Sequence, residues 1–318
     1  MSDLDLNVVL ESAALAPSVH NTQPWQFSTS GEMIDVRANR TRQLKFLDPT
    51  GRQLHLSCGA AAEFAYLTVR ASDRACAVDV LPDPSDHDLL ARLHIGAEQP
   101  ASQRERDLAA AIPRRYTDRG PYDDRPVPRD LLEEVAQRCA ELGVWLRVLD
   151  HDARSTVVLV LGDSEAAEAA DPRYAEEIAS WTTSSTAEEG IPAAAHPTWP
   201  GDRVSDVPLR DFTGHGSHPR SEDFPSDLPP TVERDTVLLL GTEYDEPGSW
   251  MAAGRALGEA LLRFAAAGLA AQPLGQAIDL ASGRARLRLD LDLVGHPQFL
   301  LRVGYGTGQP ATRRRTSG

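Results

Sequence analysis

The sequence predicts an α+β fold made of two halves. Segments with apolar residues at helical spacing recur along the chain, and short alternating or continuously apolar runs typical of strands lie between them. A proline-rich, charged stretch from Ile112 to Pro128 separates two parts that each contain both kinds of pattern. The 318 residues, 41% of them hydrophobic, can bury one large core or two medium ones. We therefore expect a first half at 1–112 and a second at 113–318.

The first half begins with a helix followed by a hairpin. Residues 6–14 have helical apolar spacing, and an Ala-Pro-Ser step follows them. Residues 25–38 are typical of two short strands joined by a Ser-Gly turn. The alanines of residues 60–65 indicate a buried helix that lets its neighbours approach closely, and Ser102 opens a short helix with a capping box. Residues 81–99 give no clear pattern.

The second half alternates helical and strand patterns. Residues 156–162 look like a strand, although helices flank them. Residues 286–293 alternate with period two, as a strand does, but their leucines and arginines suit a surface helix equally well. The other expected elements are a helix at 131–139, a strand at 144–150, a helix at 172–181, a strand at 236–241, a helix at 249–268 and a strand at 298–306.

The segment from Gly190 to Glu233 differs from the rest in composition. It carries eight prolines, several glycines and scattered charges. Such a stretch is too long for a routine connection between elements, so it is either a disordered insert or a lid over a site.

Charge and cysteine content limit the partners and the compartment. The net charge of -15 and the pI of about 5.0 argue against nucleic acid and anionic membranes as partners, because both attract basic surfaces. Three widely spaced cysteines without a C-x-x-C pair indicate neither a disulfide framework nor a zinc site and fit a reducing cytoplasm. The first residues resemble neither a signal peptide nor a membrane anchor. We expect a cytoplasmic protein that acts on a small molecule.

Two short stretches carry the polar chemistry. Residues 16–27 read APSVHNTQPWQF, which presents a serine and two carboxamides in quick succession, and carboxamides can donate and accept along a heteroaromatic rim. Residues 114–119 read RRYTDR, a local cluster of arginines on an acidic chain, and arginine binds phosphate oxygens with two parallel hydrogen bonds. On spacing alone, a polar loop that caps backbone groups and a solvated linker explain these stretches as well.

At this point the sequence resembles the flavin mononucleotide (FMN) dependent nitroreductases, whose interface loop has the form A-P-S-x-x-N-x-Q-P-W-x-F. It is most similar to the single-chain, lidded NAD(P)H nitroreductases of the Acg type. The shared segments, in chain order, are HNTQPW, DPTGR, GAA, EEGIP, RDF and PQFLLRVGYG. The resemblance covers nearly the whole chain and implies a nitroreductase-like α+β fold, with an antiparallel-rich sheet in each half and helices packed between the sheets.

The resemblance also implies one FMN site shared by the two halves. In ordinary nitroreductases an arginine-rich segment precedes the A-P-S loop in each chain of a homodimer. Here the loop lies in the first half and the arginines begin the second. We therefore expect a fused pseudo-dimer with a lid insert at 190–233, present as a monomer or a weak homodimer.

By the same resemblance, individual residues take roles at the flavin. Carried over from the family pattern, Ser18, Asn21 and Gln23 bond flavin edge atoms. Arg115 and Thr117 are expected to bind the phosphate, and Arg119 is expected to reach the N1/O2 edge of the ring. Pro273, Leu274 and Gly275 match the segment that passes the N5 side, and Arg314 and Arg315 match a terminal phosphate arm.

The implied activity is hydride transfer from NADPH or NADH, through flavin N5, to a nitroaromatic or quinone-like acceptor. No protein nucleophile is required, because the flavin carries the chemistry. Two alternatives stay open: a lidded protein that sequesters FMN with little turnover, and a protein with this fold that binds no flavin. The HGSH stretch at His215–His218 is a weak sign of a metal or hydrolase site, because no G-x-S-x-G elbow accompanies it.

Overall fold

The computed structural model describes residues 4–183, 187–192, 203–205, 207, 231–233, 236–306 and 313–315. The α-helices are α1 Leu6–Ala14, α2 Arg52–Ala71, α3 Gln103–Ala111, α4 Arg129–Glu141, α5 His151–Ala170, α6 Pro172–Ser180, α7 Pro247–Ala266, α8 Gln276–Asp279 and α9 Ala281–Asp290. Short 3-10 helices are η1 Val19–Asn21, η2 Arg40–Arg42 and η3 Ile112–Arg114. The strands are β1 Trp25–Ser30, β2 Met33–Ala38, β3 Arg74–Val80, β4 Leu89–Glu98, β5 Val144–Val148, β6 Thr182–Thr183, β7 Ile191–Pro192, β8 Arg203–Ser205, β9 Thr231–Glu233, β10 Thr236–Thr242, β11 Ala270–Pro273 and β12 His296–Gly304. The expected α+β class is confirmed.

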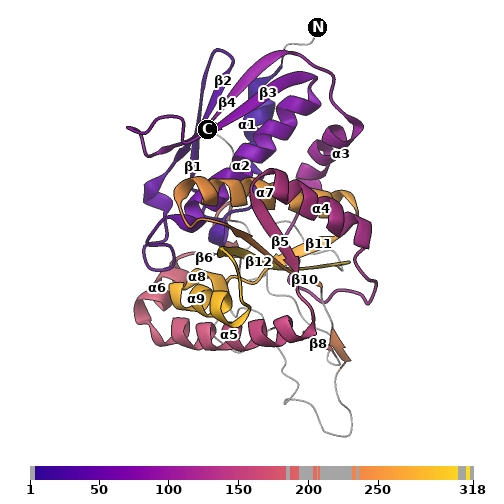
Figure 1. Ribbon diagram of the computed structural model, residues 1–318. Helices are drawn as coiled ribbons and strands as arrows, with labels where there is room; N and C mark the ends of the chain where they lie inside the picture. The colour runs from indigo at the N-terminus through magenta and orange to yellow at the C-terminus, as the bar shows by residue number, and fades with distance from the viewer. Residues whose placement is uncertain are drawn as a thin grey trace, which may run out of the picture.

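The first sheet has the order β1-β2-β4-β3, with every neighbouring pair antiparallel. The predicted hairpin is confirmed: Trp25 pairs with Ala38 and Ser30 with Met33. Gly31 turns the chain between them with φ +58°, a left-handed conformation that glycine adopts without strain. In β2 every second residue is buried, which is the period of a strand with one face on the core. Helix α2 lies against this sheet (Figure 1).

The second sheet has the order β11-β12-β10-β5 and is also antiparallel. Its strand β10 explains the continuous apolar run at 236–241. Leu238 and Leu240 pack with α4 and α7 on one face, whereas Val237 and Leu239 pack with α5, α8 and α9 on the other. Helices therefore cover both faces, as Figure 1 shows, and Val237 to Leu240 are all apolar because none of them faces water.

Helices α2 and α7 cross between the two sheets (Figure 1). They approach so closely that a Cβ atom added to Gly59 would come within 2.5 Å of the carbonyl oxygen of Met251, and one added to Gly254 would overlap the carbonyl oxygen of Leu56. The alanines at 60–62 and Ala65 are all buried, as predicted for a helix with close neighbours. One helix lies before the predicted boundary at residue 112 and the other after it.

A group of buried charges, here called the crossing ion cluster, joins these helices to α4. The Arg255 Nε donates to Glu63 Oε2 at 2.7 Å, and Arg138 Nε and Arg263 Nη2 each donate to Glu259 at 2.6 Å. Arg138 also lies 3.6 Å from the other oxygen of Glu63. Burial raises the pKa of Glu63, while the arginine bonds lower the pKa of Glu259 despite its burial.

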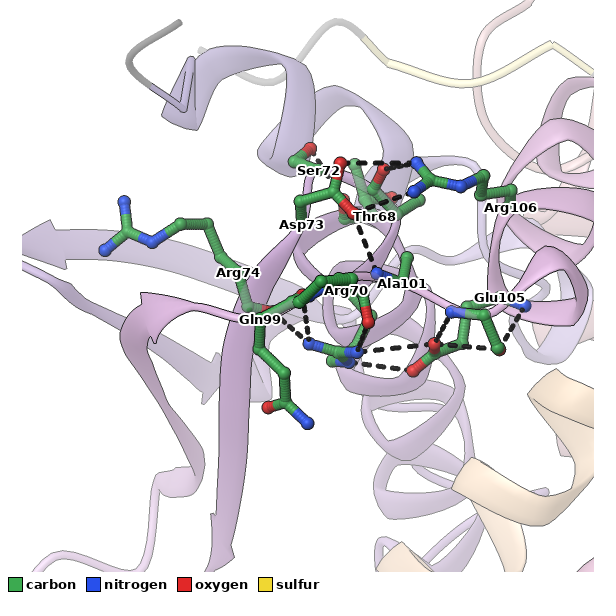
Figure 2. A network of polar contacts seen from close by, with 12 residues as sticks. Thr68, Arg70, Ser72, Asp73, Arg74, Gln99, Ala101, Glu105 and Arg106 are labelled. Atoms are coloured by element: carbon green, nitrogen blue, oxygen red, sulfur yellow. Dashed lines mark hydrogen bonds and ion pairs between the residues drawn. The ribbon is translucent and has the colours of Figure 1, made fainter. Parts of the chain in front are cut away.

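A second polar network ties the end of α2 to the start of α3 (Figure 2). Arg70 Nε donates to Glu105 Oε1 at 2.7 Å, and Glu105 closes the predicted capping box at Ser102. Asp73 accepts the Ala101 N–H at 2.7 Å and a bond from Arg106 at 2.8 Å. The network fixes the segment that leads from the first sheet toward the arginine-rich stretch.

The strand expected at 156–162 is wrong, because these residues lie in helix α5. Asp150 caps that helix by accepting the Ala153 N–H at 2.9 Å, and its buried residues Val157, Val160 and Leu161 have helical spacing. A short apolar run fits both periods, and the flanking alanines extend the helix through it.

The segment at 286–293, for which both structures were open, is mostly helical, in α9. Leu287 and Leu291 are buried four residues apart, whereas Leu289 between them is 75% exposed. A strand would have put all three on one face.

Cys58, Cys76 and Cys139 are free thiols. Burial raises the pKa of Cys139 to about 12, so that side chain packs as a small apolar group. Within the part of the chain that the structure describes, none of the helices has the length and apolarity needed to cross a bilayer. Most of the expected lid at 190–233, including His215–His218, lies outside the described residues.

Candidate functional site

A cavity with about 990 Å³ of empty space, part of it open to solvent, lies between elements of both halves. Its walls come from the loop before β1, the start of α2, the segment at 117–119, the turn between β11 and α8, and parts of α7 and β12. Its lining residues are Pro17, Ser18, Val19, His20, Asn21, Gln53, Leu56, Ser57, Thr117, Arg119, Ile191, Leu257, Gln272, Pro273, Gly275, Gln276, Asp279, Phe299 and Arg314.

The structure brings most of the predicted site residues to this cavity. Those in its lining are Ser18, Asn21, Thr117, Arg119, Pro273, Gly275 and Arg314. Those outside the lining are Gln23, Arg115, Leu274 and Arg315. The four come from the same segments as the seven, so the difference depends on where each side chain points.

The loop from Ser18 to Gln23 owes its shape to local polar contacts. The Ser18 hydroxyl accepts the Gln23 N–H at 2.9 Å, and the Val19 N–H donates to Ser57 Oγ at 3.2 Å, which fixes the loop to α2. His20, Asn21 and Gln23 have φ values of 45°, 55° and 49°. Residues other than glycine rarely adopt this left-handed backbone conformation, and it persists where the surrounding structure holds it in place.

In the carboxamide of Asn21, the nitrogen makes hydrogen bonds within the described part of the chain and the oxygen makes none there. Its Nδ2 donates to the carbonyl oxygens of Gly190 and Arg313, both at 3.1 Å. Among the described residues its buried Oδ1 has no hydrogen-bond partner. Asn21 therefore presents an acceptor at the cavity wall while it binds two segments distant in sequence.

Gln23 has its hydrogen bonds elsewhere. Its Nε2 donates to the carbonyl oxygen of Glu188 at 2.8 Å, and its Oε1 accepts the Arg315 N–H at 2.9 Å. Arg315 Nη2 returns a bond to the Gln23 carbonyl oxygen at 3.1 Å. Gln23 and Arg315 thus hold the 187–192 segment and the 313–315 segment against the loop.

The segment at 187–192 borders the cavity through Ile191. Asn21 bonds to it at Gly190, and Arg42 forms an ion pair with Glu189. Arg42 Nε also donates to the Thr22 carbonyl oxygen at 2.6 Å. The loop with the nitroreductase-like motif at residues 16–27 therefore also binds the 187–192 segment.

Three arginines act on one another at the cavity, where Arg119 and Arg314 are part of the lining. Desolvation, together with the charges of Arg115 and Arg119, lowers the pKa of Arg314 to about 9. Burial lowers the pKa of Arg115 to about 10, and within the described part of the chain the Arg115 Nε has no hydrogen-bond partner. Guanidinium groups buried near one another are unfavourable unless an anion joins them.

The segment with Thr117 lies beside β11. Thr117 pairs with Ala271 as an isolated parallel bridge, and the Asp118 N–H donates to the Ala271 carbonyl oxygen at 3.3 Å. This contact brings the arginines to the turn that follows β11. Leu274 in that turn is fully buried in the core formed with α5, so it supports the cavity wall from behind.

Residues that the sequence reasoning missed complete the cavity wall. Gln53 Nε2 donates to Asp279 Oδ1 at 2.6 Å, which joins α2 to α8. Gln276, only 1% exposed, carries a buried Nε2 that lacks a partner among the described residues. Gln276 directly follows the predicted Pro273–Gly275 segment, and Gln53 directly follows the DPTGR motif, so position next to a motif was the available signal.

The cavity fits a ligand that is anionic at one end and has hydrogen-bonding edge atoms elsewhere. The arginines supply the cationic end, and the Asn21 Oδ1 and Gln276 Nε2, which have no partner in the described part of the chain, supply one acceptor and one donor. FMN has this character, with a phosphate and a heteroaromatic ring. Among the described residues no group of histidine, cysteine, aspartate and glutamate side chains is arranged to hold a metal ion.

Comparison with known proteins places the chain among named relatives. No protein-family model matches it. It is 34% identical over 301 residues to "Putative NAD(P)H nitroreductase Rv3131" of Mycobacterium tuberculosis, covering 94% of this chain and 85% of the relative. It is 29% identical over 312 residues to "Putative NAD(P)H nitroreductase acg" of the same species, covering 96% and 92%. A crystal structure of a nitroreductase with bound FMN from Desulfitobacterium hafniense aligns with a TM-score of 0.41 and 10% identity, over 66% of this chain and 94% of that one.

Proposed function

The chain belongs to the NAD(P)H nitroreductase family, as its sequence resemblance predicted, and we propose that it is an FMN-dependent oxidoreductase with its flavin in this cavity. When bound, FMN supplies a site that accepts hydride from NADPH or NADH and passes it to a nitroaromatic or quinone-like acceptor. The protein contributes binding, orientation and electrostatics. The observation that carries the proposal is the arginine group at the cavity end.

That group matches what a flavin phosphate needs. Arg115 is buried and Arg314 is partly buried; desolvation lowers the pKa of each, with neighbouring positive charges adding to the effect at Arg314. A phosphate would neutralise this charge and accept charge-assisted bonds, each worth about 1.5–3 kcal/mol. The hydroxyl of Thr117 in the cavity wall can add a further donor. Arg315 would act indirectly here, through its bonds to Gln23.

The remaining predicted residues suit the ring. Ser18 and Asn21 line the cavity from the first half, and Pro273 and Gly275 line it from the second. Arg119 would approach the N1/O2 edge, where a cation favours the reduced flavin because negative charge increases there. Gln23 would fix the loop that presents Asn21.

The shared cavity supports a fused pseudo-dimer. Each sheet comes from one side of the boundary between residues 112 and 113, and α2 and α7 join them. A chain that completes its site alone can act as a monomer, with at most weak homodimers. The three free cysteines are consistent with a cytoplasmic protein.

One observation favours the alternative of an FMN-sequestering protein. The 187–192 segment is held to the cavity loop by Asn21, Gln23 and Arg42, and its Ile191 lines the cavity. If that segment stays in place, nicotinamide cannot reach the ring. In this alternative the flavin is retained but turns over slowly.

Anaerobic mixing of the purified yellow protein with NADPH and with NADH tests the proposal. Rapid bleaching of the flavin absorbance is the expected result. A protein that keeps its FMN but does not bleach over minutes would be a sequestering protein. A colourless protein that takes up no added FMN would refute both functions.

A further inference from the structure

Gln276 is a buried residue of the cavity lining, and its side-chain amide is a hydrogen-bond donor. It is 1% exposed, lines the cavity, and its Nε2 has no partner within the described part of the chain. Buried amide donors are paired in nearly all proteins, because an unmade bond costs free energy. An unpaired donor in a cavity wall indicates that a ligand atom completes it.

The backbone that carries this donor is firmly held. The N–H groups of Ile278 and Asp279 both donate to the Gly275 carbonyl oxygen at 2.8 Å. Arg52 Nη2 donates to the Ile278 carbonyl oxygen at 2.8 Å, and Gln53 holds the Asp279 carboxylate. The side chain therefore starts from a fixed point, so its amide is preorganised for a ligand and gains little from moving elsewhere.

Asn21 offers the complementary atom from the other half of the chain. Its Nδ2 donates two bonds, and its Oδ1 is an acceptor with no partner among the residues that the structure describes. A flat ring with adjacent carbonyl oxygens, ring nitrogens and an imide N–H offers partners to both atoms. The proposed function gives the phosphate to Arg115, Arg314 and Thr117, so we assign Gln276 to the ring.

Resting on the proposed function, we propose that Gln276 donates a hydrogen bond to the isoalloxazine ring and thereby sets the reduction potential of the bound flavin. Reduction adds two electrons and a proton to the ring and leaves its carbonyl and nitrogen edge richer in negative charge. A donor aimed at that edge bonds more strongly to the reduced ring than to the oxidised one. Gln276 is thus a tuning residue as well as a binding residue.

The variants Gln276→Met and Gln276→Glu test this. Met keeps the length of the side chain without a donor, and Glu keeps the shape but replaces the donor with a negative acceptor. We expect FMN and riboflavin to lose the same factor of affinity in the Met variant, about tenfold, because both carry the ring. If the reduced flavin loses about tenfold more than the oxidised one, the two-electron midpoint potential falls by about 30 mV.

The readouts are flavin dissociation constants from fluorescence and midpoint potentials from anaerobic titration against reference dyes. The expected order of potential is wild type, then Met, then Glu. Gln103→Met, an exposed glutamine on α3 bonded to Asp107, is the matched control and should change neither quantity.

The outcomes separate the two proposals. If wild type binds no flavin, the proposed function fails and this inference with it. If wild type binds flavin but both Gln276 variants keep its affinity and its potential, water completes the amide and this inference alone is refuted. A loss for FMN without an equal loss for riboflavin would assign Gln276 to the phosphate and refute it as well.

Discussion

Two groups of buried or partly buried arginines in this protein have opposite surroundings. In the crossing ion cluster, burial alone would lower the pKa of Arg138, but the bonds and charge of Glu259 raise it. At the cavity, burial and the charges of two other arginines lower the pKa of Arg314. The same side chain is balanced by carboxylates in one place and lies near other arginines in the other. The first arrangement is paired within the fold, and we propose that an anion completes the second.

The largest expected effect is on the balanced group. Arg255→Met removes the 2.7 Å partner of Glu63, a carboxylate with no exposed side-chain surface. Breaking a buried pair on one side costs about 3–5 kcal/mol, so the free energy of unfolding in urea should fall by that amount. The double variant Glu63→Gln, Arg255→Met should recover part of the loss, because it leaves no buried charge unpaired. Equal stability of wild type and Arg255→Met would show that the cluster is not structural.

Asp48 extends the comparison to a buried acid. It accepts the N–H groups of Gln53 and Leu54 at the start of α2, both at 2.9 Å, yet burial raises its pKa to about 6. The folded state therefore binds a proton that the unfolded state, with a pKa near 3.8, has released. Its contribution to stability is complete below about pH 4 and is lost as the pH rises through 6.

Asp48→Asn keeps one acceptor and abolishes this titration. The unfolding free energy of wild type should fall relative to the variant by up to about 3 kcal/mol between pH 4 and pH 7. Urea titrations of both proteins across that range measure it. Parallel pH profiles would contradict the assignment.

The smallest expected effect concerns the arginines at the cavity. Arg115→Met should weaken FMN binding about tenfold or more, the size of one charge-assisted bond, while riboflavin binding stays unchanged because riboflavin lacks the phosphate. The apoprotein should be no less stable than wild type in urea, since no carboxylate loses a partner. If Arg115→Met lowered the free energy of unfolding of the apoprotein as much as Arg255→Met does, the cavity arginines would not differ from the crossing ion cluster.

Local patterns predicted much of the fold and part of the site. The hairpin at 25–38, the alanine-rich α2 and the capping box at Ser102 follow from neighbouring residues and were predicted correctly. The run at 156–162 was wrong, because its apolar residues fit both periods and only the packing of Val157, Val160 and Leu161 decides between them.

The site was harder to predict, because motifs locate segments but not side-chain directions. Asn21, Thr117 and Arg119 line the cavity, whereas Gln23 from the same motif bonds to Glu188 and Arg315, residues far away in sequence. Gln276 stood beside a recognised segment. That its Nε2 has no partner among the described residues can be seen only in the folded structure, because the partners of α8 come from segments distant in sequence.

The close contact of α2 and α7 limits how this protein can be engineered. Leu56, whose carbonyl oxygen touches the Gly254 backbone, also lines the cavity, as does Leu257 one turn further along α7. Because the backbones of α2 and α7 are in direct contact, replacing either leucine by a smaller residue would enlarge the cavity at that point without moving the helices apart. A variant meant to admit bulkier acceptors should instead be altered at Ile191, whose segment is attached by hydrogen bonds and one ion pair and can be repositioned without disturbing the helix pair.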